Sequence, residues 1–315
     1  MSNATTAGIA SNLRILVIKL GALGDFVLAL GPCAAIRKHH PQAHITLLTT
    51  APYFELAKAS GYFDEIWLDD RVPWWRPDGW ITLRRRLRSG RFDCVYDLQT
   101  SDRSSWYFWL VGRETEWSGI ADGCSHPHDN PDRDKMHTLE RQAEQLAIAG
   151  IVVVPSPDLS WATAEVDRFD VVTPSVLIVP GGAPHRPRKR WPVSRYVSLV
   201  RGLVETGYQP VLIGTSAELE ITEAIIANCD AVKDLTGRTT LLDIATLARM
   251  SSAAIGNDTG PMHIAAAAGC RSVVLFSSDS DPALTAPRGE NVIILTRENL
   301  SDLLVDDVLA ALAND

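Results

Sequence analysis

The chain has 315 residues, of which 46% are hydrophobic and 22% are charged, and its net charge is −8. This composition excludes a wholly disordered chain, and the acidic balance argues against a general nucleic-acid-binding protein, so no nucleic-acid partner is expected. At about 100–200 residues per domain, the length predicts two domains, each large enough to bury its own core.

The cysteines and the N-terminal segment indicate the compartment. The five cysteines are widely spaced and form no CxxC pair, so neither a disulfide framework nor a structural zinc site is expected. The first apolar run, residues 13–20, is short and contains two cations, which fits neither a signal peptide nor a transmembrane helix. We therefore expect a cytoplasmic protein, which could still lie on a membrane surface.

The first half of the chain alternates continuous apolar runs with helical patterns. Residues 13–20 predict a buried strand, the glycine turn GALGD follows it, and residues 26–39 predict a helix. Further short strands are predicted at residues 45–49, 65–68 and 94–98. Continuous apolar strands separated by helices are typical of a parallel sheet that is covered on both faces.

The second half repeats this pattern after a stretch rich in Pro, Ser and Asp at about residues 156–170. Its predicted strands are 175–179, 210–213, 253–255 and 272–276, and its predicted helices are 193–206, 218–228, 241–250, 261–268 and 301–312. Two successive β/α halves predict an α/β fold of two facing Rossmann-like domains with parallel sheets. We assign residues 1–157 and 158–300 to these domains, and residues 301–315 to a C-terminal helix that could pack back toward the first domain.

Asp25 ends the turn KLGALGD, where the first strand gives way to a helix. In open α/β sheets ligands bind at this end of the strands, and glycines let the backbone approach them closely. A helix N-terminus favours the ionised form of a carboxylate, which suits a weak base for a late proton transfer from a sugar hydroxyl. The alternative is that Asp25 is only an N-cap. The GxxG spacing does not match the dinucleotide fingerprint GxGxxG.

A second glycine turn, VPGG, ends at Gly182 and is followed by four cations between Arg186 and Arg190. Cations beside a glycine turn at a strand end suit a diphosphate, with Lys189 as a point charge and Arg190 as a two-pronged donor. The alternative is a solvated basic loop.

The segment GNDTGPMH, residues 256–263, follows a strand and opens an alanine-rich helix. Asp258 or Thr259 can cap this helix, Gly260 lets the chain bend, and the free N–H groups of the first turn can bind an anion. His263 could donate a hydrogen bond to a phosphate or a sugar hydroxyl. The alternative for His263 is an ordinary histidine packed under the loop.

Residues 71–91 concentrate positive charge in an otherwise acidic chain, with seven arginines, three tryptophans and one acid, Asp78. Arginine and tryptophan together suit the headgroup region of a membrane or an anionic acceptor. The residues singled out for this surface are Arg84, Arg85, Arg86, Trp74 and Trp75. The alternative is a solvated helix face whose tryptophans contact the core.

Two weaker patterns predict no site. His126, His128 and His137 match no standard zinc spacing, and we expect them in an exposed polar loop. Asp279 and Asp281 form a DxD pair, which is common by chance, so no metal ligand is predicted.

The segments ILVIKLGALGD, VPGG with KRWP, DLTGRTTLLDIATLARM and GNDTGPMHIAAAAG occur in this order over nearly the whole chain. With them the chain resembles glycosyltransferase family 9, the bacterial lipopolysaccharide heptosyltransferases. The resemblance implies a GT-B fold with its active site between the domains. It also implies inverting, metal-independent transfer from a nucleotide diphosphate sugar, typically ADP-heptose, without a cofactor. The implied acceptor is the lipopolysaccharide inner core, a lipid-linked anionic saccharide bound by the N-terminal domain, which allows peripheral contact with the cytoplasmic face of the inner membrane.

The resemblance also implies roles for individual residues. Asp25 matches the family's proposed catalytic base, and Lys189 matches the lysine that contacts the donor. The other residues matched to the donor site are Gly182, Asp258, Thr259, Gly260 and His263, with Glu218 at the ribose and Thr239 near the base. The chain departs from the family pattern at Pro184 and His185 and at residues 277–281, all on the donor side.

Three other functions remain to be separated from this one. An epimerase of the same architecture needs no acceptor surface such as residues 71–91, and a nicotinamide dehydrogenase would need the GxGxxG turn that the chain lacks. A non-catalytic nucleotide-sugar-binding module would have no use for Asp25. Donor turnover with and without acceptor distinguishes all three.

Overall fold

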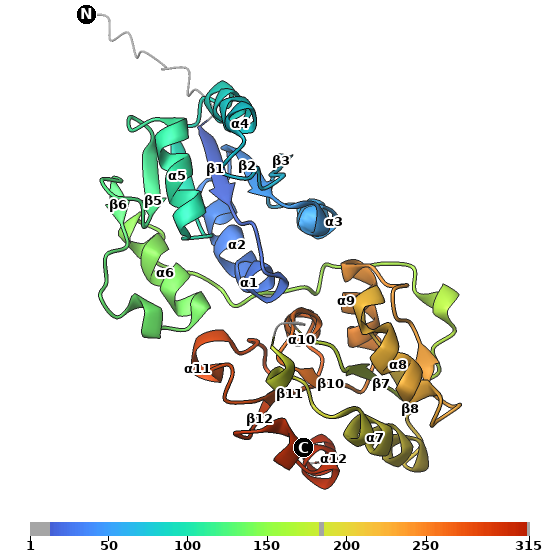
Figure 1. The fold of residues 1–315 in the computed structure, drawn as a ribbon. Helices are drawn as coiled ribbons and strands as arrows, with labels where there is room; N and C mark the ends of the chain where they lie inside the picture. Colours follow the sequence, from blue (N-terminus) through green and yellow to red (C-terminus); the bar gives the residue numbers. More distant parts are fainter. Residues whose placement is uncertain (1–12, 183–185, 314–315) are drawn as a thin grey trace, which may run out of the picture. The chain divides into compact units, whose positions relative to one another are not determined.

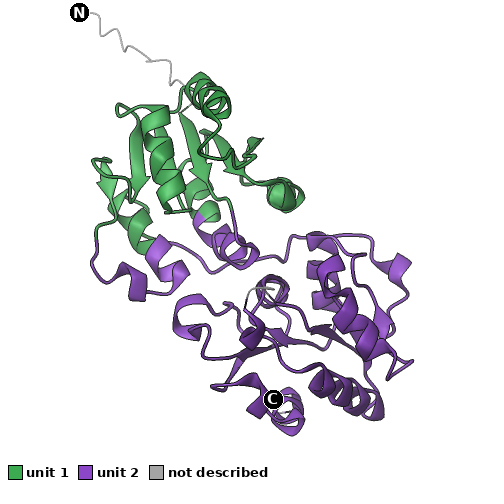
Figure 2. Ribbon diagram, in the orientation of Figure 1, with its two compact units in different colours: residues 1–20, 33–129, 143–153 green, residues 21–32, 130–142, 154–315 purple. Residues whose placement is uncertain are grey.

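The computed structural model describes residues 13–182 and 186–313. Their contacts divide the chain into two compact units (Figure 2). The first unit comprises residues 1–20, 33–129 and 143–153, and the second comprises residues 21–32, 130–142 and 154–315. Two segments of the N-terminal half therefore pack with the second unit. The domain ranges 1–157 and 158–300 stay a prediction.

The first unit is built on a six-stranded parallel sheet with the strand order β3-β2-β1-β4-β5-β6. Its strands are β1 (Arg14–Ile18), β2 (His44–Thr49), β3 (Glu65–Leu68), β4 (Cys94–Asp97), β5 (Glu116–Gly119) and β6 (His126–Pro127). The central strand β1 is buried from Ile15 to Ile18, as expected for a continuous apolar run that is covered on both faces. Its register pairs Ile18 with Asp97 of β4, so the carboxyl ends of these two strands lie side by side.

Helices cover both faces of this sheet (Figure 1). They are α2 (Leu30–His39), α3 (Phe54–Ala59), α4 (Pro77–Ser89) and α5 (Asp102–Val111), and α6 (Thr138–Ile148) begins in the second unit and ends in the first. α4 buries Leu83 and Leu87, four residues apart on one face, in the core that also holds Trp67 and Tyr107. Its arginines are left on the exposed faces.

The second unit repeats this topology with the strand order β12-β11-β10-β7-β8-β9. Its strands are β7 (Ser175–Val179), β8 (Gln209–Leu212), β9 (Lys233–Asp234), β10 (Ala253–Asn257), β11 (Ser272–Phe276) and β12 (Val292–Thr296). Its helices are α1 (Leu23–Leu28), α7 (Val193–Glu205), α8 (Leu219–Ile226), α9 (Leu241–Met250), α10 (Gly260–Ala267), α11 (Pro282–Thr285) and α12 (Val305–Ala313). Short 3-10 helices lie at Ala51–Tyr53, Arg133–Lys135, Asp167–Phe169, Pro187–Lys189, Ser216–Glu218 and Leu300–Asp302.

Side chains of α7, α8 and α12 share one core with β7 and β10, through residues such as Leu199, Ile225 and Val308. α12 thus packs on the second unit. In each sheet the chain starts at a central strand, adds two strands outward on one side, and then returns to the centre to add strands on the other side. The strand order therefore reverses between β1 and β4 in the first sheet and between β7 and β10 in the second. Such a reversal opens a crevice at the carboxyl ends of the central strands.

Two parallel sheets of alternating β/α units confirm the predicted fold class. The predicted helix at residues 26–39 is wrong in its bounds, because the structure has α1 from Leu23 to Leu28 and α2 from Leu30 to His39. Pro32 explains the interruption, since it has no N–H to donate to the carbonyl of Leu28.

Candidate active site

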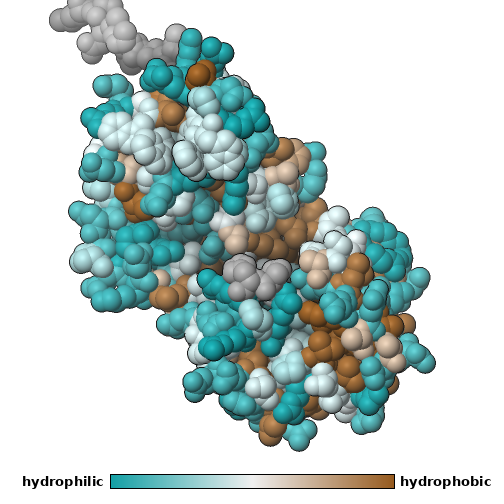
Figure 3. Space-filling model, viewed as in Figure 1, coloured by the Kyte–Doolittle hydropathy of each residue, from teal (hydrophilic) through white to brown (hydrophobic). Residues whose placement is uncertain are grey.

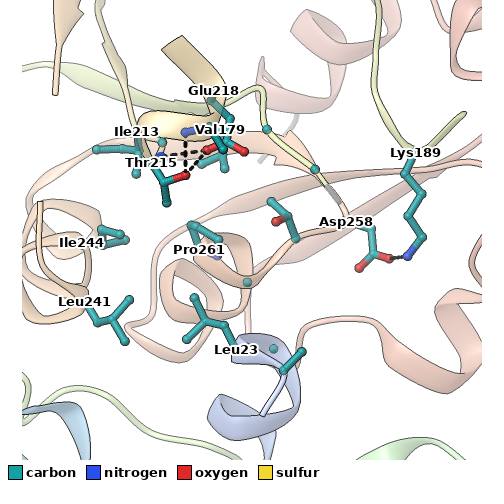
Figure 4. A pocket seen from close by; sticks show the side chains of 18 of the residues that line it. Leu23, Val179, Lys189, Ile213, Thr215, Glu218, Leu241, Ile244, Asp258 and Pro261 are labelled. Carbon is teal, nitrogen blue, oxygen red and sulfur yellow. Dashed lines mark hydrogen bonds and ion pairs between the residues drawn. The ribbon is translucent and has the colours of Figure 1, made fainter. Parts of the chain in front are cut away.

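A pocket of about 730 Å³ opens at the carboxyl ends of β7, β8 and β10. Its walls come from the start of α1, the turns after the three strands, and the starts of α9 and α10 (Figure 4). The lining residues are Ala22 to Asp25, Val179, Gly181, Gly182, Arg186, Lys189, Ile213 to Thr215, Ala217, Glu218, Thr239, Leu241, Ile244 and Asp258 to Pro261. All of them belong to the second unit. The pocket thus brings together most of the residues predicted for the donor site.

One end of the pocket is charged. Lys189 Nζ lies 2.7 Å from Asp258 Oδ2, and the two side chains are only 12% and 8% exposed (Figure 4). Asp258 directly follows β10, where its backbone N–H donates to the carbonyl of Leu275. Arg186 also lines the pocket, and the sequence suggested it only as part of a run of cations.

Asn257, the residue before Asp258, fixes the loops around this end and was not predicted. It is fully buried, and its Nδ2 donates to the carbonyls of Pro180 and Gly181 at 2.8 and 3.0 Å. Its Oδ1 accepts from Trp191 N and Tyr196 Oη, each at 3.0 Å. One side chain therefore ties the glycine turn after β7 to the segment that follows Lys189. The available sequence signal was an asparagine at the end of the apolar run AAIGN.

Arg190 has a structural role rather than the predicted role of a donor fork. Its Nε and Nη2 donate to the carbonyl of Gly182 at 3.2 and 2.7 Å, and it does not line the pocket. With these two donors the guanidinium closes the loop on its own glycine turn. Pro184 and His185, where the chain departs from the family pattern, lie outside the described residues.

The other end of the pocket is apolar and is bordered by one acid. Ile213, Leu241 and Ile244 form its wall, and Thr239 also lines the pocket (Figure 4). Glu218 Oε2 accepts from Thr215 N at 2.8 Å and from Thr215 Oγ1 at 2.6 Å, in a capping box. An apolar slot with a carboxylate at its rim can take a planar base with its ribose at the acid.

Asp25 reaches the pocket through close packing of α1 on α10. An added Cβ on Gly24 would lie 2.8 Å from His263 Nε2, and one on Gly260 would lie 2.6 Å from Leu23 Cβ, so both positions need glycine. Asp25 lies in the first turn of α1, whereas the N-cap is Ala22. The alternative that Asp25 is only an N-cap is therefore wrong.

His263 is 5% exposed, lies under the Gly24 turn, and does not line the pocket. Burial lowers the pKa of His263 to about 4, although the carboxylates of Asp258 and Asp25 act in the opposite direction. This placement matches the alternative of a packed histidine rather than a contact with phosphate or sugar. Its buried Nδ1 has no hydrogen-bond partner among the described residues. Thr259 occupies the N-cap of α10, but its side chain makes no capping bond.

The two acids of the DxD pair have structural roles. Asp281 caps α11 by accepting from Ala283 N at 2.8 Å, and Asp279 lies 3.9 Å from Arg188. In the part of the chain that the structure describes, no three His, Cys, Asp or Glu residues are grouped to hold a metal ion.

The expectation of an exposed histidine loop is wrong for two of the three histidines. His128 and His137 are each 2% exposed. His137 Nε2 lies 2.9 Å from the carbonyl of Ala286, so this histidine fastens the start of α6 within the second unit.

The basic segment 71–91 lies on the first unit. Trp74 and Trp75 are 80% and 66% exposed, and Arg84 and Arg85 are exposed on α4. Arg86 is different, because its Nη1 donates to the carbonyl of Leu68 and its guanidinium stacks on Trp67 at 4.8 Å. On the face shown in Figure 3, the region around α4 is mainly hydrophilic or near-neutral, with isolated hydrophobic residues.

Two further exposed tryptophans lie on α5, which packs beside α4. Trp106 and Trp109 are 64% and 43% exposed and lie three residues apart, on one face of the helix. The sequence analysis missed them, although tryptophans at this spacing in DRSSWYFWLV were the available signal. None of the helices in residues 13–182 and 186–313 has the length and apolar character needed to span a bilayer.

Comparisons with known proteins show which family and fold this chain resembles. A family model described as glycosyltransferase family 9 (heptosyltransferase) matches residues 80–303. Lipopolysaccharide heptosyltransferase 2 of Salmonella typhimurium is 27% identical over 303 residues, which cover 87% of this chain and 85% of that protein.

Two solved structures share the fold. The ADP-heptose lipopolysaccharide heptosyltransferase II of E. coli matches with a TM-score of 0.78 at 24% identity, covering 95% of this chain and 97% of that chain. A family 9 glycosyltransferase from Veillonella parvula matches with a TM-score of 0.82 at 22% identity, covering 95% of each chain. These likenesses confirm the predicted GT-B type of fold.

Proposed function

The chain belongs to glycosyltransferase family 9 and is a glycosyltransferase, and on this premise we propose that it transfers heptose from ADP-heptose to the inner core of lipopolysaccharide. The donor and the acceptor are supported by the names of the relatives, which are lipopolysaccharide heptosyltransferases, and by the apolar slot that ends at charged groups. The diphosphate lies toward Lys189 and Arg186, and the base lies toward Leu241 and Ile244.

The proposed reaction is a direct displacement with inversion at the anomeric carbon. Asp25 takes the proton of the acceptor hydroxyl while the oxygen of that hydroxyl forms the new bond to the anomeric carbon. The bond from this carbon to the diphosphate oxygen breaks, and the nucleoside diphosphate leaves with the electron pair. Lys189 and the start of α10, where Gly260 carries a backbone N–H, stabilise the negative charge that develops on it.

The observation that carries this proposal is that Asp25, Lys189 and Asp258 line one pocket. A base is of use only if a hydroxyl reaches the same space as the donor, so a non-catalytic binding module would not need Asp25 there. The test is donor turnover with purified protein. Transfer that requires the lipopolysaccharide acceptor supports the proposal, whereas turnover of the donor sugar without an acceptor would indicate an epimerase.

We expect transfer to continue after metal ions are removed. In the proposed mechanism Lys189 and α10 stabilise the leaving group, while Asp279 already pairs with Arg188 and Asp281 caps α11. Initial rates in EDTA should equal those in buffer with Mg²⁺. A rate lost in EDTA and restored by Mg²⁺ or Mn²⁺ would instead assign Asp279 and Asp281 as metal ligands.

We also propose that the N-terminal domain, residues 1–157, receives the lipid-linked acceptor while residues 158–300 bind the donor. The support is the cationic and aromatic surface of α4 and α5, which suits a lipid-linked anionic saccharide and the anionic inner leaflet that carries it. The protein would then work as a peripheral protein at the cytoplasmic face of the inner membrane.

A further inference from the structure

The Lys189–Asp258 ion pair places the main cation of the pocket against a carboxylate. The two atoms are 2.7 Å apart, and both side chains are nearly buried. The backbone of Asp258 is held in place, because its N–H is bound to Leu275 O and the preceding Asn257 makes four hydrogen bonds. The charge of Lys189 is therefore matched by a carboxylate whose backbone is held in place.

A bound diphosphate must compete with this carboxylate for the ammonium group of Lys189. A partly buried carboxylate that loses its cation, and faces a phosphate instead, raises the free energy of the complex. Hydroxyl groups of a sugar attached to the diphosphate can donate hydrogen bonds to Asp258 and offset this cost. A nucleoside diphosphate without its sugar has no donors at that place.

We propose that Asp258 is a specificity-determining residue that favours the sugar-bearing donor over the nucleoside diphosphate left by the reaction. This inference rests on the proposed donor class. Its consequence is that the spent nucleotide binds weakly and leaves, so product inhibition is mild. Without the carboxylate, Lys189 keeps its full charge for any diphosphate, with or without a sugar.

The test is isothermal titration of ADP and of ADP-heptose into the wild-type protein and Asp258→Asn. We expect the variant to bind ADP at least about tenfold more tightly, because an anion adjacent to the diphosphate has been removed, and to bind ADP-heptose no more tightly than wild type. The ratio of the two dissociation constants should fall by about tenfold or more. The inhibition constant of ADP in the transfer assay should fall in parallel.

Asp279→Asn is the matched control. Asp279 is a carboxylate beside Arg188 of the same basic loop, but it does not line the pocket, so its removal changes the general charge without freeing Lys189. Asp258→Glu should restore part of the discrimination. If thermal unfolding shows that Asp258→Asn is not folded, Asp258→Ser removes the same charge with a smaller side chain.

Equal ADP affinity in wild type, Asp258→Asn and Asp279→Asn would overturn the inference. A gain in ADP affinity that is the same in both variants would also overturn it, because general charge would then be the cause. If wild type binds neither ADP nor ADP-heptose, the proposed donor class is wrong instead.

Discussion

Asp25 lies in the first turn of α1, on the wall of the pocket that also holds Lys189 and Asp258. Two of these side chains follow a residue that is fixed by packing or hydrogen bonds: Gly24, before Asp25, packs on His263, and Asn257, before Asp258, donates to the carbonyls of Pro180 and Gly181. Single residues thus set the chemistry of the pocket, and single substitutions can separate binding from transfer.

Asp25→Asn tests the proposed base. The amide cannot accept the proton of the acceptor hydroxyl, so we expect transfer to fall by about 10²–10⁴-fold, while ADP binds as in wild type. Steady-state rates and titration calorimetry on the same preparation measure the two effects. Wild-type transfer by the Asn variant would remove Asp25 from the mechanism.

Asp97, at the end of β4, predicts a pH dependence of stability. Burial raises the pKa of this carboxyl to about 6, against the lowering effect of its hydrogen bonds, and its Oδ2 has no partner among the described residues. When the pKa of a carboxyl is higher in the folded than in the unfolded protein, the folded protein binds the proton more tightly. Its ionisation therefore lowers stability as pH rises from about 4 to about 6.

Asp97→Asn should remove this dependence. Relative to wild type, the variant should gain unfolding free energy progressively between about pH 4 and pH 6 and keep the gain above that range. Urea unfolding followed by circular dichroism at several pH values is the measurement. A constant difference between the two proteins across this range would show that Asp97 titrates normally.

At the scale of elements, the packing of α1 on α10 places the proposed base. The contact is made by glycines facing His263 and Leu23, with no room for an added methyl group at either place. α1 itself is only six residues long, so its position depends on this packing rather than on its own helical stability.

Gly24→Ala should therefore displace α1 and cut transfer by about 10²-fold, while ADP binding is largely kept. The double variant Gly24→Ala, His263→Ala should recover part of the rate, because the added methyl group then has space. Gly202→Ala on α7 is the control, since its methyl group would meet only the flexible end of Leu309. If the double variant is no better than Gly24→Ala alone, the contact does not position Asp25.

At the scale of the whole molecule, charge is distributed unevenly. The chain has a net charge of −8, yet residues 71–91 carry seven arginines against one acid. Of these arginines, Arg86 is held against Trp67 and Leu68, and Arg76 pairs with Asp78 at 2.7 Å. Asp78 thus offsets the charge of Arg76, and the exposed Arg84 and Arg85 contribute to the outward charge of this surface.

We expect salt-sensitive binding to anionic liposomes but not to neutral ones. Each basic side chain near an anionic leaflet contributes about 1 kcal/mol, and exposed tryptophans can lie at the headgroup level. Replacing Arg84 and Arg85 with Gln should abolish co-sedimentation, and replacing Trp106 and Trp109 with Ser should weaken it. The double replacement of Arg195 and Arg201 by Gln, on α7, is the control, and equal partitioning of all variants would indicate an ordinary solvated surface.

The sequence by itself determined the class of fold and the segments that form the pocket. Continuous apolar runs such as residues 13–20 and 175–179 are typical of strands in a parallel sheet covered on both faces, and turns after such strands meet at one edge. The strands β5, β6, β9 and β12 were not predicted. Three of these are short or carry polar residues, whereas β12 is an apolar run, VIILT, that was overlooked.

Only the tertiary structure decided what each side chain does within those segments. Arg190 and Lys189 are adjacent in sequence, but one binds the carbonyl of Gly182 and the other binds Asp258, 69 residues away. His263 is covered by Gly24, which comes from a distant segment of the chain. The same packing of α1 on α10 joins residues 21–32 to the second unit. A local pattern records periodicity and the ends of strands, whereas the direction and the partner of a side chain depend on residues that only packing brings together.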